Sequence, residues 1–204
     1  MSFLLLGFFT GLSLILAIGA QNIFVIEQGL KKQYIFLVCL ICSLSDLILI
    51  FLGIFLFEYF RIYFTNFVEL IFNVLLLVFL AYFIISKLRF NYDKLILNLE
   101  SKKIPLTNII IKTLGFTYLN PHVYSDTVFF LGNFSKNFLI VEKYYFGFGA
   151  SLASLLFFFG IGYLSKFLSK YLKNQTIWKF INIFIIVFMS FLALYVLLDI
   201  LNLS

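Results

Sequence analysis

Long apolar runs separated by short polar segments dominate this chain. Six runs are long enough to cross a membrane as helices, since a helical span needs about 20 apolar residues. They cover residues 3–27, 33–57, 66–86, 108–131, 145–168 and 177–201. The first and fourth runs are the least uniform, because each contains a tetrapeptide of small, polar or helix-breaking residues. The pattern predicts an all-α membrane protein with six transmembrane helices, in which spans 1 and 4 are interrupted.

Composition supports this fold class and excludes a soluble domain. The chain has 204 residues, of which 63% are hydrophobic and 12% are charged, and its mean hydropathy is +1.10. Soluble domains average about 25% charged residues. We therefore expect one polytopic domain over residues 1–204. Its parts are a first half at 1–86, a polar cytoplasmic loop at 87–107 and a second half at 108–204.

The basic residues predict how the chain is oriented. Of the 15 Lys and Arg residues, 12 fall in the turns after spans 1, 3 and 5, and three fall on the other side. Lys and Arg collect in cytoplasmic loops. We expect a multi-pass membrane protein with the loops after spans 1, 3 and 5 in the cytoplasm and both termini on the outer side. The start lacks a basic region and is expected to be a retained helix. The net charge of +6 reports this topology, and no nucleic-acid-binding motif accompanies it.

Three spans in each half mean that the second half enters the membrane upside down relative to the first. A shift of 101 residues aligns the tetrapeptide Gly19-Ala20-Gln21-Asn22 with Asn120-Pro121-His122-Val123. Interrupted spans in two inverted repeats are typical of transporters that bind their cargo near the middle of the membrane. The sequence therefore predicts two inverted three-helix repeats with a binding site between the breaks.

Two aspartates lie inside the apolar runs. A carboxylate at the centre of a membrane costs about 2.5–3.5 kcal/mol on insertion scales, so it usually has a function. Asp46 is 14 residues past Lys32 and Asp126 is 14 residues past Lys112. At 1.5 Å per residue, both carboxylates lie roughly 21 Å from the cytoplasmic face. A buried structural hydrogen bond is the alternative role for either aspartate.

This arrangement suits a zwitterion with a cationic side chain. Broken helices free backbone N–H groups that attract a carboxylate, and the paired aspartates would face the cation. One aspartate can take a proton when the cargo leaves, because two close like charges are unfavourable. His122, the single histidine, is a candidate proton relay. Its alternative role is to satisfy the backbone groups that Pro121 frees.

Four segments in these regions resemble the LysE family of amino-acid exporters, and its arginine-exporting branch most of all. They are Gly19-Ala20-Gln21-Asn22, Gln28-Gly29-Leu30-Lys31-Lys32, Ser45-Asp46 and Leu119-Asn120-Pro121-His122-Val123-Tyr124-Ser125-Asp126-Thr127. The resemblance covers nearly the whole chain. It implies export of arginine or lysine across the inner membrane by a six-span fold of two inverted repeats.

By position, the resemblance implies a set of substrate-binding residues. These are Gln21, Asn22, Asp46, Asn120, Pro121 and Asp126. The chain has Ala20 where the family usually has a proline. The first break is therefore expected to be milder than a break that contains this proline, and to depend on Gly19 alone.

Other functions stay open at this stage. Cys39 and Cys42 lie on one face of span 2, which allows an intramembrane thiol oxidoreductase as well as ordinary packing. The same fold could also export a metal cation or a neutral amino acid. We expect no enzymatic activity, cofactor or resident metal, and the expected partners are a small amino acid and membrane lipid. Gly7 and Gly11 predict close helix packing, with a homodimer contact as one option.

Overall fold

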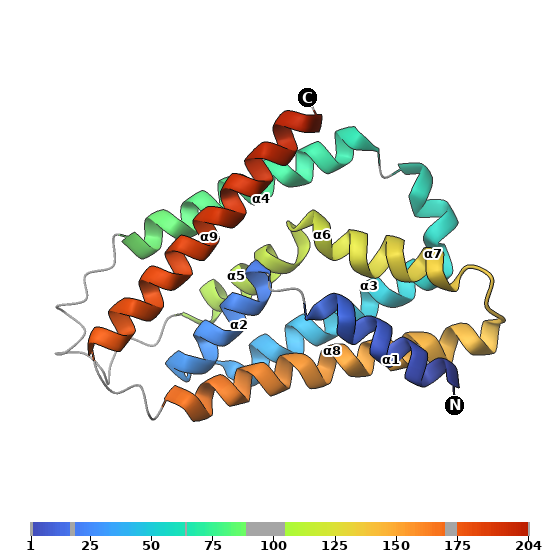
Figure 1. The fold of residues 1–204 in the computed structure, drawn as a ribbon, viewed down its shortest axis with the longest axis horizontal. Helices are drawn as coiled ribbons and strands as arrows, with labels where there is room; N and C mark the ends of the chain where they lie inside the picture. Colours follow the sequence, from blue (N-terminus) through green and yellow to red (C-terminus); the bar gives the residue numbers. More distant parts are fainter. Residues whose placement is uncertain (1, 17–18, 64, 89–104, 170–174, 204) are drawn as a thin grey trace.

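The structure, a computed structural model, describes residues 2–16, 19–63, 65–88, 105–169 and 175–203, and these residues form helices joined by short connections (Figure 1). The first half contains α1 (Ser2–Ile15), α2 (Ala20–Lys31), α3 (Ile35–Tyr63) and α4 (Asn66–Leu88). The second half contains α5 (Leu106–Tyr118), α6 (Pro121–Tyr124), the π-helix η2 (Ser125–Phe130), α7 (Leu131–Ser135), α8 (Ile140–Ser169) and α9 (Gln175–Leu203). No strand occurs in these ranges, so the predicted all-α fold is confirmed for them.

Helix occupies each of the six predicted ranges, and the first and fourth ranges are divided. Within the described residues, Ile35–Phe57 of α3 and all of α8 are long and apolar enough to cross a membrane. The bent pair of α1 and α2 meets the same criteria when the two are taken together. Shorter apolar stretches occupy the middle of α4 and α9. Most of the cytoplasmic loop expected at 87–107 lies outside the described residues.

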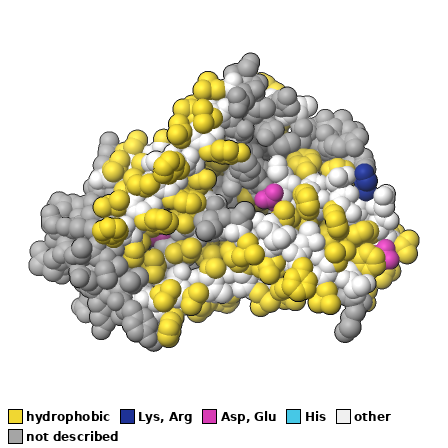
Figure 2. Space-filling view, viewed as in Figure 1, with side chains coloured by type: hydrophobic (Ala, Val, Ile, Leu, Met, Phe, Trp, Pro, Cys, Tyr) yellow, Lys and Arg dark blue, Asp and Glu magenta, His cyan; other side chains and the backbone are white. Residues whose placement is uncertain are grey.

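The surface of the molecule agrees with a lipid environment. Large hydrophobic side chains are exposed along α4, α8 and α9, including Val78, Leu164 and Phe191, each more than half exposed. Figure 2 shows hydrophobic side chains over much of the described part of one face, with an acidic side chain near its centre. Water would disfavour such a surface, whereas lipid tails solvate it.

The interrupted segment of each half packs on the first long helix of the other half. α1 and α2 lie along α8, whereas α5, η2 and α7 lie along α3. α3 and α8 also pack on each other, and so do α4 and α9 (Figure 1). The two halves are thus interleaved, and their interrupted segments are brought to the centre.

Glycines allow these crossings to be very close. A Cβ on Gly7 would lie 2.0 Å from the Phe146 carbonyl oxygen, and a Cβ on Gly149 would lie 2.0 Å from that of Leu4. Small residues permit this approach of helix backbones inside membranes. The prediction of close packing at Gly7 and Gly11 is confirmed. Both glycines are buried against α8 of the same chain, so their use as a homodimer contact is a wrong interpretation.

A cluster of phenylalanines joins α2, α4 and α5. The rings of Phe24, Phe79 and Phe83 surround that of Phe116, with centroid distances of 5.1, 4.8 and 5.0 Å. Phe24, Phe83 and Phe116 are almost completely buried. We call these four residues the aromatic cluster. It belongs to the main hydrophobic core and fixes α4 against the two interrupted segments.

Candidate functional site: a polar cavity between the two breaks

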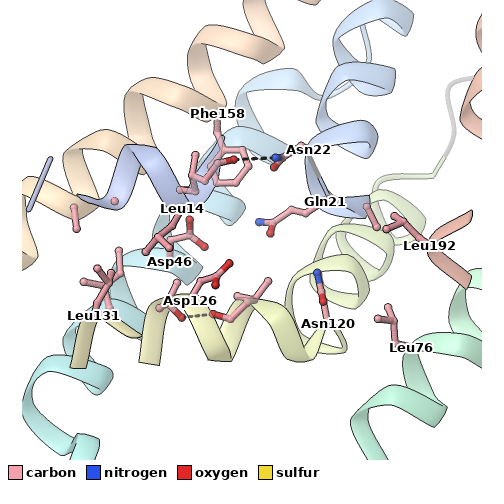
Figure 3. Close-up of a pocket in the computed structure, with 18 of the residues that line it drawn as sticks. Leu14, Gln21, Asn22, Asp46, Leu76, Asn120, Asp126, Leu131, Phe158 and Leu192 are labelled. Carbon is pink, nitrogen blue, oxygen red and sulfur yellow. Dashed lines mark hydrogen bonds between the residues drawn. The ribbon is translucent and has the colours of Figure 1, made fainter. Parts of the chain in front are cut away.

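A cavity of about 250 Å³ lies where the two interrupted segments meet (Figure 3). Its polar lining includes Gln21, Asn22, Asp46, Asn120, Asp126 and Thr127. Apolar side chains of α1, α4, α7, α8 and α9 complete the walls. Ligand pockets in proteins are apolar with a few polar groups that converge on the ligand. The volume lies just below the usual range of about 300–1,000 Å³ for such pockets, so only a small cargo can occupy it.

Asp46 reaches the cavity from the middle of α3. The residue is 2% exposed, and its Oδ2 accepts a hydrogen bond of 2.7 Å from the hydroxyl of Ser154 on α8. Ser154 itself is fully buried. A buried carboxylate requires partners of this kind, because removing its charge from water is costly. One oxygen of Asp46 is therefore held by the opposite half of the protein.

Asp126 reaches the same cavity from η2 and is half-buried. A π-helix is rare, and single turns of it occur often at functional sites. The hydroxyl of Thr127, one residue later, donates to the Val123 carbonyl at 2.6 Å. Figure 3 shows the carboxyl groups of Asp46 and Asp126 close to each other at one cavity, with the Gln21 amide facing them. The structure therefore brings the two predicted acids together.

The first break is sharp. α1 ends at Ile15, α2 begins at Ala20, and the two helix axes differ by 84°. Gly19 is the N-cap of α2 with extended backbone angles, φ −113° and ψ −179°. The side chain of Asn22 donates from Nδ2 to the Ile15 carbonyl at 3.1 Å. This bond satisfies a carbonyl that the end of α1 would otherwise leave without a partner.

The expectation of a mild first break at Ala20 is therefore wrong. A proline is one means of interrupting a helix, because it lacks an N–H and clashes with the preceding turn. Here an extended Gly19 and the Asn22 side chain produce the interruption instead. Ala20 starts α2 as an ordinary first helical residue.

The second break is shorter and uses different residues. α5 ends at Tyr118 and α6 begins at Pro121. Proline is favoured at the first position of a helix, where no N–H is needed. The Tyr124 hydroxyl donates to the Tyr118 carbonyl at 2.9 Å and so satisfies the end of α5. The side chains of Pro121 and His122 lie outside the described part of the structure, so the predicted proton relay at His122 stays a prediction.

Two amides face the cavity on the side of the breaks. Gln21 on α2 is 7% exposed, and its Nε2 has no hydrogen-bond partner among the described residues. Figure 3 shows the Gln21 amide, which follows the first break, directed towards the two aspartates. Asn120, which lies in the second break, is drawn near Gln21. A buried donor directed into a cavity is suited to bind an acceptor of a ligand.

Sequence reasoning missed Ser154 and the apolar walls from α4 and α9. Ser154 lies 108 residues from Asp46 in the chain, and a lone serine in an apolar helix gives no signal of such a partner. Among the wall residues are Leu76, Leu80, Leu192 and Tyr195. Their positions in uniform apolar runs did not distinguish them from residues that face lipid.

The two cysteines are not part of the cavity. Cys39 and Cys42 are both fully buried and free, and the Cys39 thiol donates to the Phe158 carbonyl at 3.2 Å. They pack in the main hydrophobic core. This position favours the packing role over a redox pair, which needs an accessible thiolate. No group of three or more His, Cys, Asp or Glu residues within the described ranges is arranged to hold a metal ion.

The chain is similar in sequence to known transport proteins. The family model "LysE type translocator" matches residues 12–200. The arginine exporter protein ArgO of Klebsiella pneumoniae subsp. pneumoniae is 34% identical over 188 residues, which cover 92% of this chain and 89% of that protein. The protein of the same name from Pectobacterium carotovorum subsp. carotovorum is 33% identical over 198 residues, covering 92% and 93% of the two chains. No solved structure matches this chain.

Proposed function

This chain belongs to the LysE type translocator family, and from that premise we propose that it exports arginine or lysine across the bacterial inner membrane. Its relatives are named arginine exporters, and the chain matches them over almost their full length. The observation that carries the proposal is the meeting of Asp46 and Asp126 in one cavity of amino-acid size. Two carboxylates in a hydrocarbon surrounding favour a cationic cargo.

The cargo lies across the cavity in a defined direction. Its guanidinium or ammonium group faces Asp46 and Asp126, because Arg and Lys groups form strong charge-assisted hydrogen bonds with carboxylates. Its α-carboxylate faces the breaks, where the Gln21 amide supplies a donor and the N-terminus of α2 supplies a partial positive charge. Asn22 and Asn120 complete this polar end.

The proposed architecture is two inverted repeats of three spans each. The exchange of packing partners supports it, since the interrupted segment of either half lies on the first long helix of the other half. Both termini then lie in the periplasm, and the basic turns lie in the cytoplasm. Transport follows an alternating-access cycle around the central cavity.

The aromatic cluster forms the barrier on the cytoplasmic side. Along α2 it lies between the cavity-lining Gln21 and Lys31, and along α5 it lies between Asn120 and Lys112. Lys31 forms an ion pair with the buried Glu27, and the Lys112 ammonium lies 5.7 Å from the centroid of the Phe83 ring. A fully packed set of rings excludes a hydrated amino acid, so this barrier must separate before cargo enters from the cytoplasm.

Proton coupling is the proposed energy source. When the cargo has left, one of the two carboxyl groups takes a proton, which removes the repulsion between them. The empty, protonated site then opens again to the cytoplasm, with a proton in place of the cation. This exchange moves one positive charge in each direction.

Transport in inverted membrane vesicles tests the proposal. Labelled arginine should accumulate in vesicles that contain the protein and should accumulate less when the pH gradient is dissipated. Competition with unlabelled lysine, threonine and Cd²⁺ distinguishes cationic amino acids from neutral amino acids and metal cations. No accumulation of labelled arginine, or accumulation that threonine or Cd²⁺ suppresses and lysine does not, would overturn the proposed cargo.

A further inference from the structure

The Ser154 hydroxyl differs from five other buried hydroxyl groups among the described residues. Ser43, Thr113, Thr117, Thr127 and Ser135 each donate to the carbonyl four residues earlier in their own segment. This is the usual bond of a serine or threonine inside a helix. Ser154 instead donates across the interface between α8 and α3, to the carboxylate of Asp46. The Ser154 hydroxyl thus bonds to a residue of the proposed cargo site in place of a backbone carbonyl of α8.

We infer that Ser154 is a positioning residue for cargo, acting through Asp46. This inference rests on the proposed function. The bond from Ser154 fixes Oδ2 of Asp46, and the carboxyl group lines the cavity with its remaining capacity to accept hydrogen bonds. The torsion that orients a carboxylate is broad, so an unheld carboxylate would sample many directions. Ser154 thus presents Asp46 to the cation in one orientation.

The position of Ser154 also links the two halves of the protein. Asp46 belongs to the first half, and Ser154 belongs to the second. The two long helices that carry them pack against each other, and both side chains are buried at that contact. The orientation of the acid therefore depends on how α3 and α8 sit together. A change of that contact during transport would release Asp46 and weaken its hold on the cation.

The test is the split between KM and kcat for arginine transport in inverted vesicles. Ser154→Ala removes only the hydroxyl, and the apparent KM should rise about tenfold, the size expected for one hydrogen bond to a charged group. The kcat should change much less, since the carboxylate and the break residues remain. Ser154→Cys keeps a weak donor of similar size and should give an intermediate KM.

Ser43→Ala is the matched control. Ser43 is also a buried serine, three residues before Asp46 on α3, but its hydroxyl bonds to the Cys39 carbonyl within α3. Its KM should stay at the wild-type value. Equal rises in KM for Ser43→Ala and Ser154→Ala would assign the effect to helix packing and overturn the inference.

A second measurement uses binding and is independent of turnover. Arginine should raise the melting temperature of the purified wild-type protein, and this stabilisation should be smaller in Ser154→Ala. In an Asp46→Asn background, Ser154→Ala should cause no further loss, because both changes act on the same contact. Additive losses would overturn the inference. Wild-type protein that neither binds nor transports arginine would instead defeat the proposed function.

Discussion

The two interrupted segments reach the same cavity by different construction. In the first, the break lies between α1 and α2, the axes differ by 84°, and the side chain of Asn22 satisfies the end of α1. In the second, the break is shorter, Pro121 starts the next helix, and the Tyr124 hydroxyl satisfies the end of α5. The two halves thus share the location of a break without sharing the residues that make it.

The acids differ in the same way. Asp46 is on the uninterrupted helix α3, is nearly inaccessible and is held by Ser154. Asp126 is on the interrupted segment itself, within a π-helix, and is only half-buried. A fully buried acid and a partly exposed acid suit a site that must bind cargo and later release it. We therefore expect the two halves to contribute unequally to transport.

Asp46→Asn should have the largest effect on export. A cargo cation left without its buried partner costs about 3–5 kcal/mol, which corresponds to at least a 100-fold loss of transport rate. The measurement is uptake of labelled arginine at low concentration into inverted vesicles, with the amount of protein matched by immunoblot. Wild-type uptake by this variant would remove Asp46 from the site.

Asp126→Asn should reduce transport less, by about tenfold, since a partly exposed carboxylate shares its role with water. The same vesicle assay compares the two variants directly. A loss as large as that of Asp46→Asn would contradict the unequal division of roles between the halves.

Glycine substitutions test the close crossings that hold both interrupted segments. Gly149→Ala places a Cβ 2.0 Å from the Leu4 carbonyl, and Gly53→Ala places one 2.6 Å from that of Thr127. Overpacking of this kind costs typically about 1–3 kcal/mol, so each variant should melt at a lower temperature than the wild type. Gly160→Ala, where no atom lies within 4 Å of the new Cβ, is the control and should melt normally.

The two helix-end bonds should have smaller and distinguishable effects. Tyr124→Phe and Asn22→Leu each remove one donor of about 1 kcal/mol and should lower the melting temperature by a few degrees. Asn22→Leu should also raise the KM for arginine, because Asn22 lines the cavity. Tyr124→Phe should leave the KM near normal, and an equal KM effect for both variants would contradict this distinction.

The double variant Cys39→Ala with Cys42→Ala should have the smallest effect. Both thiols are buried in the core and neither lines the cavity, so arginine transport should stay within about twofold of the wild type. Loss of transport with normal folding would revive a role for the thiols.

Much of the fold could be predicted from the sequence, because hydrocarbon permits few alternatives to a helix. Each predicted apolar range contains helix, although α3 continues to Tyr63, past the predicted end at residue 57. Asp46 and Asp126 were identifiable because a charge within an apolar run is costly. The shared cavity was expected from their equal depth along parallel segments.

Other features depend on contacts between distant parts of the chain. Ser154 has no local signal, since its bond to Asp46 exists only when α3 and α8 pack together. The sharp first break was misjudged because the rule for proline describes one cause of a break and not the Asn22 bond. The π-helix around Asp126 was not predicted either, because its residues Ser125–Phe130 have no distinctive pattern.

The glycine contacts have a consequence for motion. Where Gly7 and Gly149 bring α1 and α8 together, backbone touches backbone, and no side chain lies between them that could change its rotamer. This contact between two helices therefore has no flexible side chain that could let them shift against each other. We therefore expect α1 and α8 to move together as one rigid body. In the proposed transport cycle, the hinges then belong to the segments around Gly19 and Asn120.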